Sequence, residues 1–300
     1  MTEYAYWALL CVAALLPAAM GCMPPHRGKI LHLGLAGVMV MGGWAGAQAA
    51  RLPLPEGWTV VCAVCIAGAA GAVWALTAGA AAMRAAADAE ISGTVLNLLF
   101  ALPALLMGGK ADGEDGLARM LRVEWMDRAW SLFIPLSFLL AGLTLLLLYR
   151  TKGGVAMRAA GENPGVAAEA GLGACGPRIK ALLLTGALGG ISGLAWRLHG
   201  PDGSALQTGG LALLVLAALC FGRYRAWRVL VAAVLLALLR ALAAAADSME
   251  VLQRLNCPRE IWQMLPYGTA LLLCLIGKRR GGEGRTWLGY RFQSQGRNML

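Results

Sequence analysis

The chain has 300 residues, of which 59% are apolar and only 14% are charged, whereas a soluble domain is close to half apolar and one quarter charged. This balance excludes an ordinary soluble globular domain. The net charge of +10 would suit a nucleic-acid-binding protein, but such proteins concentrate Lys and Arg on one face of a soluble domain. Here the basic residues stand between apolar runs, so we expect no nucleic-acid partner and interpret the charge as a sign of membrane topology.

Nine apolar segments, each near the length that crosses a bilayer, follow one another along the chain. They cover residues 4–22, 30–50, 58–83, 91–108, 130–149, 179–198, 205–221, 229–246 and 260–277. The seventh segment is the shortest and is the candidate for a half-spanning helix. The pattern predicts an all-α integral membrane protein, a polytopic helical bundle of about 8–10 transmembrane helices. We expect one transmembrane domain over residues 1–280, with an inner loop at 150–180, and a tail over residues 281–300.

Lys and Arg gather in every second connection between the apolar segments. These connections contain Arg27, Lys29, Arg84, Arg150, Lys152, Arg158, Arg178, Lys180, Arg223, Arg225, Arg228 and the cluster from Lys278 onward. Because short cytoplasmic loops carry an excess of Lys and Arg, this side is predicted to be cytoplasmic. The N-terminus is then predicted outside and the tail inside. The opening residues lack the positive charge of a signal peptide, so segment 4–22 is predicted to be the first spanning helix.

Small residues inside the apolar segments are interpreted as packing residues. Pairs of glycines stand four residues apart at Gly42 and Gly46, Gly186 and Gly190, and Gly189 and Gly193. This spacing lets helix backbones approach closely in lipid. Cys62 and Cys65 form a C-x-x-C pair, but no second Cys or His pair accompanies them. We therefore expect no metal site and no cofactor.

The motifs of ATP hydrolysis and of common hydrolases are missing. No G-x-x-x-x-G-K-[ST] motif occurs, so we expect this chain not to hydrolyse ATP itself. Residues 171–176 fit G-x-G-x-x-G, but helix formers precede them and Pro177 is expected to disrupt a following helix, which argues against a dinucleotide site. A membrane enzyme would need ionisable side chains that converge at membrane depth, and it stays an alternative if Arg240, Asp88 and Glu90 surround one polar cavity.

The inner loop 150–180 contains its own helix signals. Asn163 is a good N-cap, Pro164 suits the first helical position, and Glu162 adds negative charge beside the helix start. Gly171 is expected to end this short helix. The residues alone leave two interpretations open: an inert loop element, or a helix that docks into another protein.

Five stretches together resemble a known family. They are residues 28–46, 87–97, 149–171, 184–194 and 258–267, and the R-A-x-G-E-N-P block from Arg158 is the most specific. The chain resembles the permease subunits of ABC importers in the branched-chain amino acid and simple-sugar superfamily, most of all the shorter permease of nucleoside-type systems. It departs from the family pattern at His32 and Ala36, where these permeases usually carry Asn and Glu.

The resemblance implies a multi-pass permease of the bacterial inner (cytoplasmic) membrane, without an enzymatic activity of its own. Its implied partners are an ATPase subunit, a second paralogous permease that is longer, an extracytoplasmic substrate-binding lipoprotein and membrane lipid. The solute would be a nucleoside, riboflavin or a simple sugar. The helix at 163–170 would then couple to the ATPase, through Gly161, Glu162, Asn163, Pro164, Ala167 and Gly171. The alternative transport class is an ion-coupled secondary transporter, which needs no ATPase.

Polar groups at membrane depth suggest a solute pathway. Trp44 and Gln48 are one turn apart on the second segment, and Asn97 lies on the fourth. Aromatic and amide groups suit a planar, hydroxyl-bearing solute. The competing interpretation is that Gln48 and Asn97 form hydrogen bonds between helices that only stabilise the fold.

Overall fold

The computed structural model describes residues 2–24, 34–52, 55–84, 125–162, 175–199, 205–222, 225–245 and 259–279, and the single positions Val95, Asn97, Leu99, Glu169 and Gly171. These residues form helices α1 (Thr2–Gly21), α3 (Leu35–Ala49), α4 (Glu56–Arg84), α7 (Trp125–Arg150), α8 (Lys152–Glu162), α10 (Cys175–His199), α11 (Ala205–Gly222), α12 (Ala226–Ala245) and α14 (Arg259–Arg279). No strand occurs among them, which confirms the all-α prediction.

Most of the predicted apolar segments coincide with these helices. Segment 91–108 is described only at Val95, Asn97 and Leu99, which are helical, and the tail 281–300 lies outside the described residues. α11, which covers the segment predicted to be shortest, has 18 residues, and the described part of segment 30–50 forms α3 with 15. α3 ends at Ala49, close to the predicted end, because the chain turns at Arg51 and Leu52, just before Pro53, and a residue that precedes proline disfavours helix.

Several of the helices suit a membrane. Four described stretches are long and apolar enough to cross it, namely Trp58–Ala80, Phe133–Arg150, Gly176–Leu198 and Ala226–Ala245, and Trp7–Gly21 and Gly210–Gly222 are shorter apolar helices. Trp58 and Trp227, 69% and 71% exposed, stand near the start of α4 and of α12. Tryptophan is enriched where a bilayer meets water, so these positions are typical of interface anchors. The fold is that of a polytopic membrane protein.

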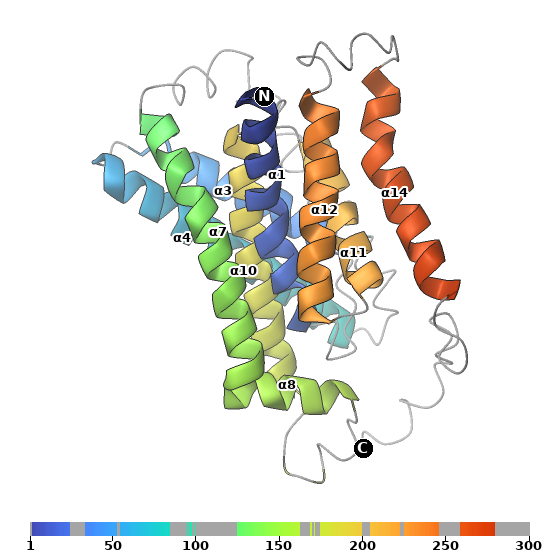
Figure 1. The fold of residues 1–300 in the computed structure, drawn as a ribbon. Coiled ribbons are helices and arrows are strands. Elements are labelled where there is room, and N and C mark those ends of the chain that lie inside the picture. Colours follow the sequence, from blue (N-terminus) through green and yellow to red (C-terminus); the bar gives the residue numbers. More distant parts are fainter. Residues whose placement is uncertain are drawn as a thin grey trace.

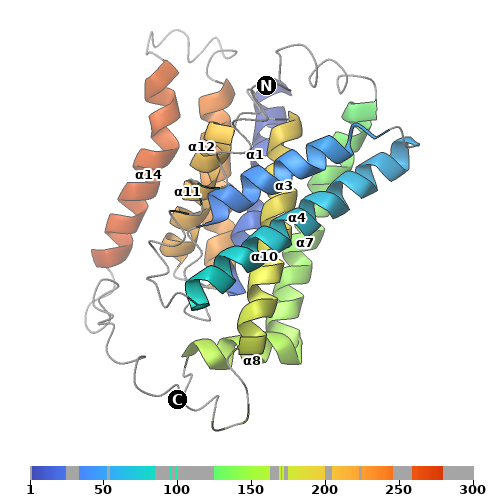
Figure 2. The same ribbon diagram turned by 180° about the vertical axis from the view of Figure 1, so that it is seen from behind.

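Of the described helices, α1, α4, α7, α11 and α14 run toward one end of the bundle and α3, α10 and α12 run away from it, so the predicted basic connections meet at that end (Figures 1 and 2). The described basic residues at this end are Arg84, Arg150, Lys152, Arg158, Arg178, Lys180, Arg225, Arg228, Lys278 and Arg279. We call it the basic end. α8 lies across it, and the N-terminus lies at the opposite end (Figure 1). This arrangement agrees with a cytoplasmic basic end and an outside N-terminus.

α3, α4 and α10 touch through their backbones. A Cβ added at Gly190 of α10 would collide with the carbonyl oxygen of Ala67 in α4, and one added at Gly42 of α3 would collide with Gly190 itself. Gly193 lies equally close to the Met39 carbonyl, and Gly71 of α4 to the Gly186 carbonyl. The predicted close approach at the glycine pairs is confirmed, with Gly71 as a further member. In Figure 2, α3 and α4 cross α10 obliquely.

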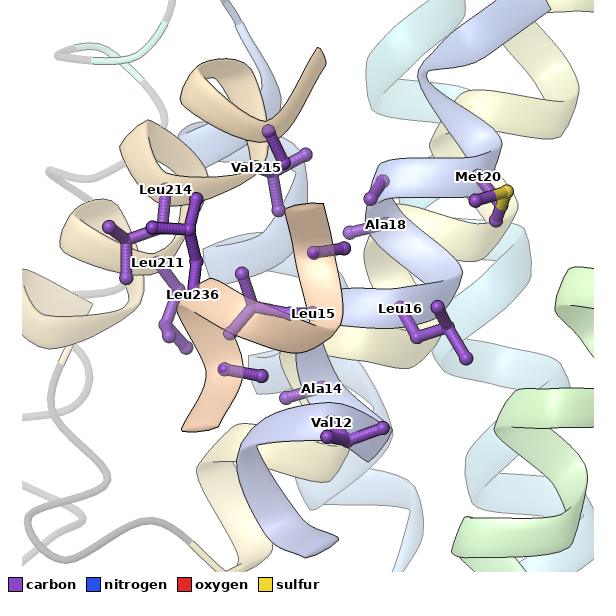
Figure 3. Close-up of a cluster of buried hydrophobic side chains, with 14 of the residues drawn as sticks. Val12, Ala14, Leu15, Leu16, Ala18, Met20, Leu211, Leu214, Val215 and Leu236 are labelled. Atoms are coloured by element: carbon purple, nitrogen blue, oxygen red, sulfur yellow. The ribbon is translucent and has the colours of Figure 1, made fainter. Parts of the chain in front are cut away.

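α1 is the central helix on the other side of α10. Every residue from 10 to 24 is buried, as expected of a helix that is apolar on all sides. Leu15 of α1 packs in one cluster with Leu211 and Leu214 of α11 and Leu236 of α12 (Figure 3). The end of α1 is tied to α10, because the Thr185 hydroxyl lies 2.6 Å from the Gly21 carbonyl oxygen and 2.9 Å from that of Ala181.

One prediction concerns the backbone contact. Gly190→Ala places a methyl group 3.0 Å from the Ala67 carbonyl carbon and 3.2 Å from the Gly71 Cα, so the helices must move apart. We expect a loss of about 1–3 kcal/mol in stability, the usual cost of overpacking. The measurement is thermal unfolding of the detergent-purified protein. Gly142→Ala in α7 is the control, because nothing lies within 4 Å of its added Cβ. Equal unfolding temperatures for the two variants would contradict the role of this contact.

Candidate functional site

The corner between α7 and α8 has a defined geometry. The backbone N–H of Gly154 donates to the Thr151 hydroxyl at 3.1 Å, and the N–H of Val155 donates to the Thr151 carbonyl at 3.1 Å. Thr151 therefore caps the first turn of α8. Gly154 lies so close to the carbonyls of Leu147 and Leu148 that a Cβ would collide with both. α8 can therefore turn sharply from the end of α7, as Figure 1 shows.

A second contact holds α8 against α7. The guanidinium carbon of Arg158 lies 5.0 Å from the centre of the Tyr149 ring, within the range of a cation–π interaction. α8 also contacts the start of α10. Lys152 and Val155 remain exposed, so α8 presents a mixed basic and apolar surface at the basic end. Thr151 and Gly154 were not singled out from the sequence, although a threonine beside the start of a helix is a recognisable cap signal. Arg158 was named as the start of the R-A-x-G-E-N-P block, but its contact with Tyr149 was not foreseen.

The predicted coupling residues lie at and beyond the end of α8. Gly161 and Glu162 are the last two residues of this helix. Asn163, Pro164 and Ala167 lie outside the described residues, so the helix predicted at 163–170 stays a prediction. Glu169 is helical and exposed, and Gly171 has a φ of +75°, the left-handed conformation of a glycine that ends a helix. The helix at 152–162 was not predicted.

The last two residues of the G-x-G-x-x-G match, Cys175 and Gly176, lie in α10. α10 begins at Cys175, and Pro177 lies within its first turn. The expectation that Pro177 disrupts a following helix is therefore wrong. The first four N–H groups of a helix have no partner within the helix, so a proline without an N–H is tolerated there.

The structure does not bring the three predicted pathway residues together. The Asn97 Oδ1 accepts a hydrogen bond from the backbone N–H of Gly37 at 2.9 Å, and this N–H belongs to the first turn of α3, where it has no acceptor within the helix. Gln48, about 16 Å further along α3, accepts through Oε1 from Arg51 Nη1 at 3.2 Å. Asn97 thus makes a contact between helices, as the competing interpretation expects, whereas the Gln48 contact stays within one segment, three residues apart. Trp44 differs, because its buried indole N–H has no hydrogen-bond partner among the described residues.

A second polar group lies at the opposite end of the bundle from α8. Arg240 of α12 is only 8% exposed, and its guanidinium carbon lies 5.6 Å from the centre of the Trp196 ring in α10. Buried arginine is rare at membrane depth and typically marks function there.

The fold is that of a polytopic membrane protein that carries a polar region near each end. Over residues 5–275, the chain matches the family described as branched-chain amino acid transport system / permease component, and it belongs to this family. It is 25% identical to the nucleoside ABC transporter permease protein NupC of Lactococcus lactis subsp. cremoris, over 90% of this chain and 91% of that protein. It is also 25% identical to the guanosine ABC transporter permease protein NupQ of Bacillus subtilis, over 72% of this chain and 74% of that protein. No solved structure matches.

Family membership establishes the role of the chain in broad terms. It is a multi-pass permease subunit of an ABC importer in the bacterial inner membrane, not an enzyme, and ATP is hydrolysed on a separate subunit. An ATPase and a substrate-binding protein are its partners in such an importer. The membrane-enzyme alternative is thereby set aside. Asp88 and Glu90, which that alternative required beside Arg240, lie outside the described residues.

The α7–α8 corner gives the second prediction. Gly154→Ala should drive the chain away from the carbonyls of Leu147 and Leu148, whereas Gly153→Ala meets nothing nearer than the Thr151 hydroxyl oxygen at 3.9 Å. We expect Gly154→Ala to speed amide hydrogen exchange in α8, because a displaced corner weakens the cap, and Gly153→Ala to slow it, because alanine favours helix. Hydrogen-exchange mass spectrometry measures both. If the two variants exchange alike, the corner does not hold α8.

Proposed function

We propose that the solute of this importer is a nucleoside. The observation that carries the proposal is that both relatives are nucleoside-type permeases and that the match to one of them runs along nine-tenths of each chain. A nucleoside is planar at its base and carries hydroxyl groups, so it needs aromatic and hydrogen-bonding side chains along its route. Trp44, Trp196 and Arg240 supply such groups inside the bundle.

The complete importer would contain a second, paralogous permease, and the substrate-binding protein would be an extracytoplasmic lipoprotein. Exposed apolar side chains indicate that other membrane helices or lipid surround this chain. They gather on α4 at Val61, Ile66 and Val73, and on α7 at Phe138, Leu139, Leu143 and Leu146. Exposed apolar surface of this extent is typical of a protein that faces hydrocarbon or another membrane helix.

The ATPase would dock at the basic end, on α8 and the segment that follows it. Two features support this assignment. α8 is held at a fixed angle to α7 by the Thr151 cap and the Gly154 contact, so a push on α8 is transmitted to a spanning helix. The predicted coupling residues Gly161 and Glu162 are the last two residues of α8, and the others follow it along the chain. A capped helix transmits motion better than a loose loop, which would absorb it.

The solute pathway would pass Trp44 of α3. Its half-buried indole has a donor without an acceptor, and a buried donor in this state costs about 1–3 kcal/mol until a ligand or water satisfies it. Gln48, one turn away, would offer its amide when the contact to Arg51 opens. Asn97 would line the route from the start of α3, where it caps Gly37.

The function predicts ATP-driven nucleoside uptake. Vesicles that hold this chain with its ATPase, partner permease and binding lipoprotein should accumulate labelled guanosine or adenosine only when ATP is present on the ATPase side. Accumulation driven by an ion gradient, with this chain alone, would instead support a secondary transporter.

In the same assay, Trp44→Phe, Gln48→Ala and Asn97→Ala test the pathway, and normal uptake by all three would remove that assignment.

A separate prediction concerns the coupling segment. Ala167→Pro should break a helix at 163–170, because a proline inside a helix costs about 3 kcal/mol and removes a backbone hydrogen bond. Membrane insertion and pairing with the second permease should persist, while co-purification of the ATPase and ATP-dependent uptake are lost. Glu162→Lys sets a positive charge beside the start of the predicted helix 163–170. It should weaken coupling less than Ala167→Pro does. Retention of ATPase binding and full uptake by Ala167→Pro would show that this helix does not couple.

A further inference from the structure

α10 carries a line of buried polar side chains on one face. Thr185, Ser192 and Trp196 stand seven and four residues apart, a spacing that places them on the same side of a helix, and all three are fully buried. Thr185 is satisfied, because its hydroxyl contacts the carbonyls of Gly21 and Ala181. Within the part of the chain that the structure describes, the Ser192 hydroxyl and the Trp196 indole N–H have no hydrogen-bond partner.

Unmade hydrogen bonds at this depth need an explanation. A serine in a membrane helix normally bonds back to the carbonyl four residues earlier, as Thr185 does, but Ser192 does not. Hydrocarbon offers no water to satisfy such groups, so each one is costly to keep. The two groups lie one helical turn apart, and Arg240 stacks on the ring of Trp196. Ser192, Trp196 and Arg240 therefore form a single cluster of hydrogen-bond donors, which we call the donor cluster.

The donor cluster lies toward the end of the bundle opposite the basic end. The predicted topology places this end outside the cell, and we call it the outer end. Trp196 is three residues from the end of α10 at His199, and Arg240 is five residues from the end of α12 at Ala245. Because an α-helix rises about 1.5 Å per residue, Trp196 and Arg240 lie roughly 5 to 8 Å from the outer ends of their helices. Ser192 lies about 10 Å from the outer end of α10. Both helices end opposite α8 (Figure 1). A solute that arrives from the extracytoplasmic side would reach this level first.

We propose that Ser192, Trp196 and Arg240 form a recognition site for the base of the transported nucleoside, and that the site prefers a 6-oxopurine to adenine. This inference depends on the nucleoside function proposed above. An indole N–H and a guanidinium can only donate hydrogen bonds, so the ligand must present acceptors. The O6 and N7 atoms of guanine or hypoxanthine are two adjacent acceptors that suit the fork of an arginine, whereas adenine presents an amino donor in place of O6.

The described conformation is closed at this level. Trp196 is fully buried, and Arg240, only 8% exposed, reaches from α12 to the ring of Trp196 in α10. The stacked pair blocks the site until the solute arrives. When α12 separates from α10, the guanidinium leaves the indole face and turns to the base, which then takes its place beside Trp196. An aromatic face and a guanidinium both stack readily on a purine.

The test is the uptake ratio of guanosine to adenosine by the complete importer in vesicles. Arg240→Lys keeps the charge but loses the two-pronged donor, so we expect guanosine uptake to fall about tenfold and adenosine uptake much less. Ser192→Ala should lower the ratio in the same direction by a smaller factor. Ser137→Ala in α7 is the matched control, because this serine is equally buried but its hydroxyl already donates to the Ile134 carbonyl at 2.7 Å.

The outcomes separate the two proposals. A lower ratio in Arg240→Lys and Ser192→Ala, with an unchanged ratio in Ser137→Ala, supports the recognition site. An unchanged ratio in both donor-cluster variants, whether or not total uptake falls, overturns it and leaves Arg240 as an anchor between helices. Ser192→Ala removes one oxygen atom, so it provides a folded variant if Arg240→Lys does not assemble. Absence of uptake of either nucleoside by the unaltered importer would overturn the proposed function and this inference with it.

Discussion

The backbone contact of α10 with α3 and α4 is the constraint on which the rest of the structure depends. In lipid no hydrophobic effect draws helices together, so close van der Waals packing has to hold them. Gly42, Gly71, Gly190 and Gly193 let the three backbones meet where a single methyl group would collide with a carbonyl. This contact fixes the rotation of α10 about its axis. It thereby turns Thr185, Ser192 and Trp196 toward the side on which α1 packs.

α10 connects the two functional ends of the molecule. Its 25 residues span about 37 Å, more than the hydrocarbon thickness of a bilayer. One end contacts α8, whose cap and cation–π contact hold it against α7, and the other end carries Trp196 beneath Arg240. In the proposed mechanism, movement of α8 would be transmitted along α10 as a rigid displacement, because α10 is tightly packed. This gives a physical route by which ATP-driven closure at the basic end would open the donor cluster at the other.

Sequence reasoning predicted what hydrophobic length and spacing encode, and it missed what depends on tertiary partners. The long apolar runs gave the helices, and the four-residue glycine spacing gave their close contact. α8 was missed because Gly153 and Gly154 weaken the local helix signal, and only the carbonyls of α7 explain Gly154. The pathway role of Asn97 stays a prediction, and the sequence did not reveal that its side-chain oxygen accepts from an N–H of α3, sixty positions away in the chain. No local pattern reveals such a partner.

One structure determination tests directly whether this chain receives its solute at the end that holds Arg240 and meets its ATPase at the end that holds α8, as we propose. A cryo-electron microscopy reconstruction of the assembled importer in lipid would place both partners. We predict ATPase density against α8 and the segment beyond it, and binding-protein density over the outer ends of α10 and α12. ATPase density elsewhere, or an assembly in which α8 contacts only lipid, would contradict the account.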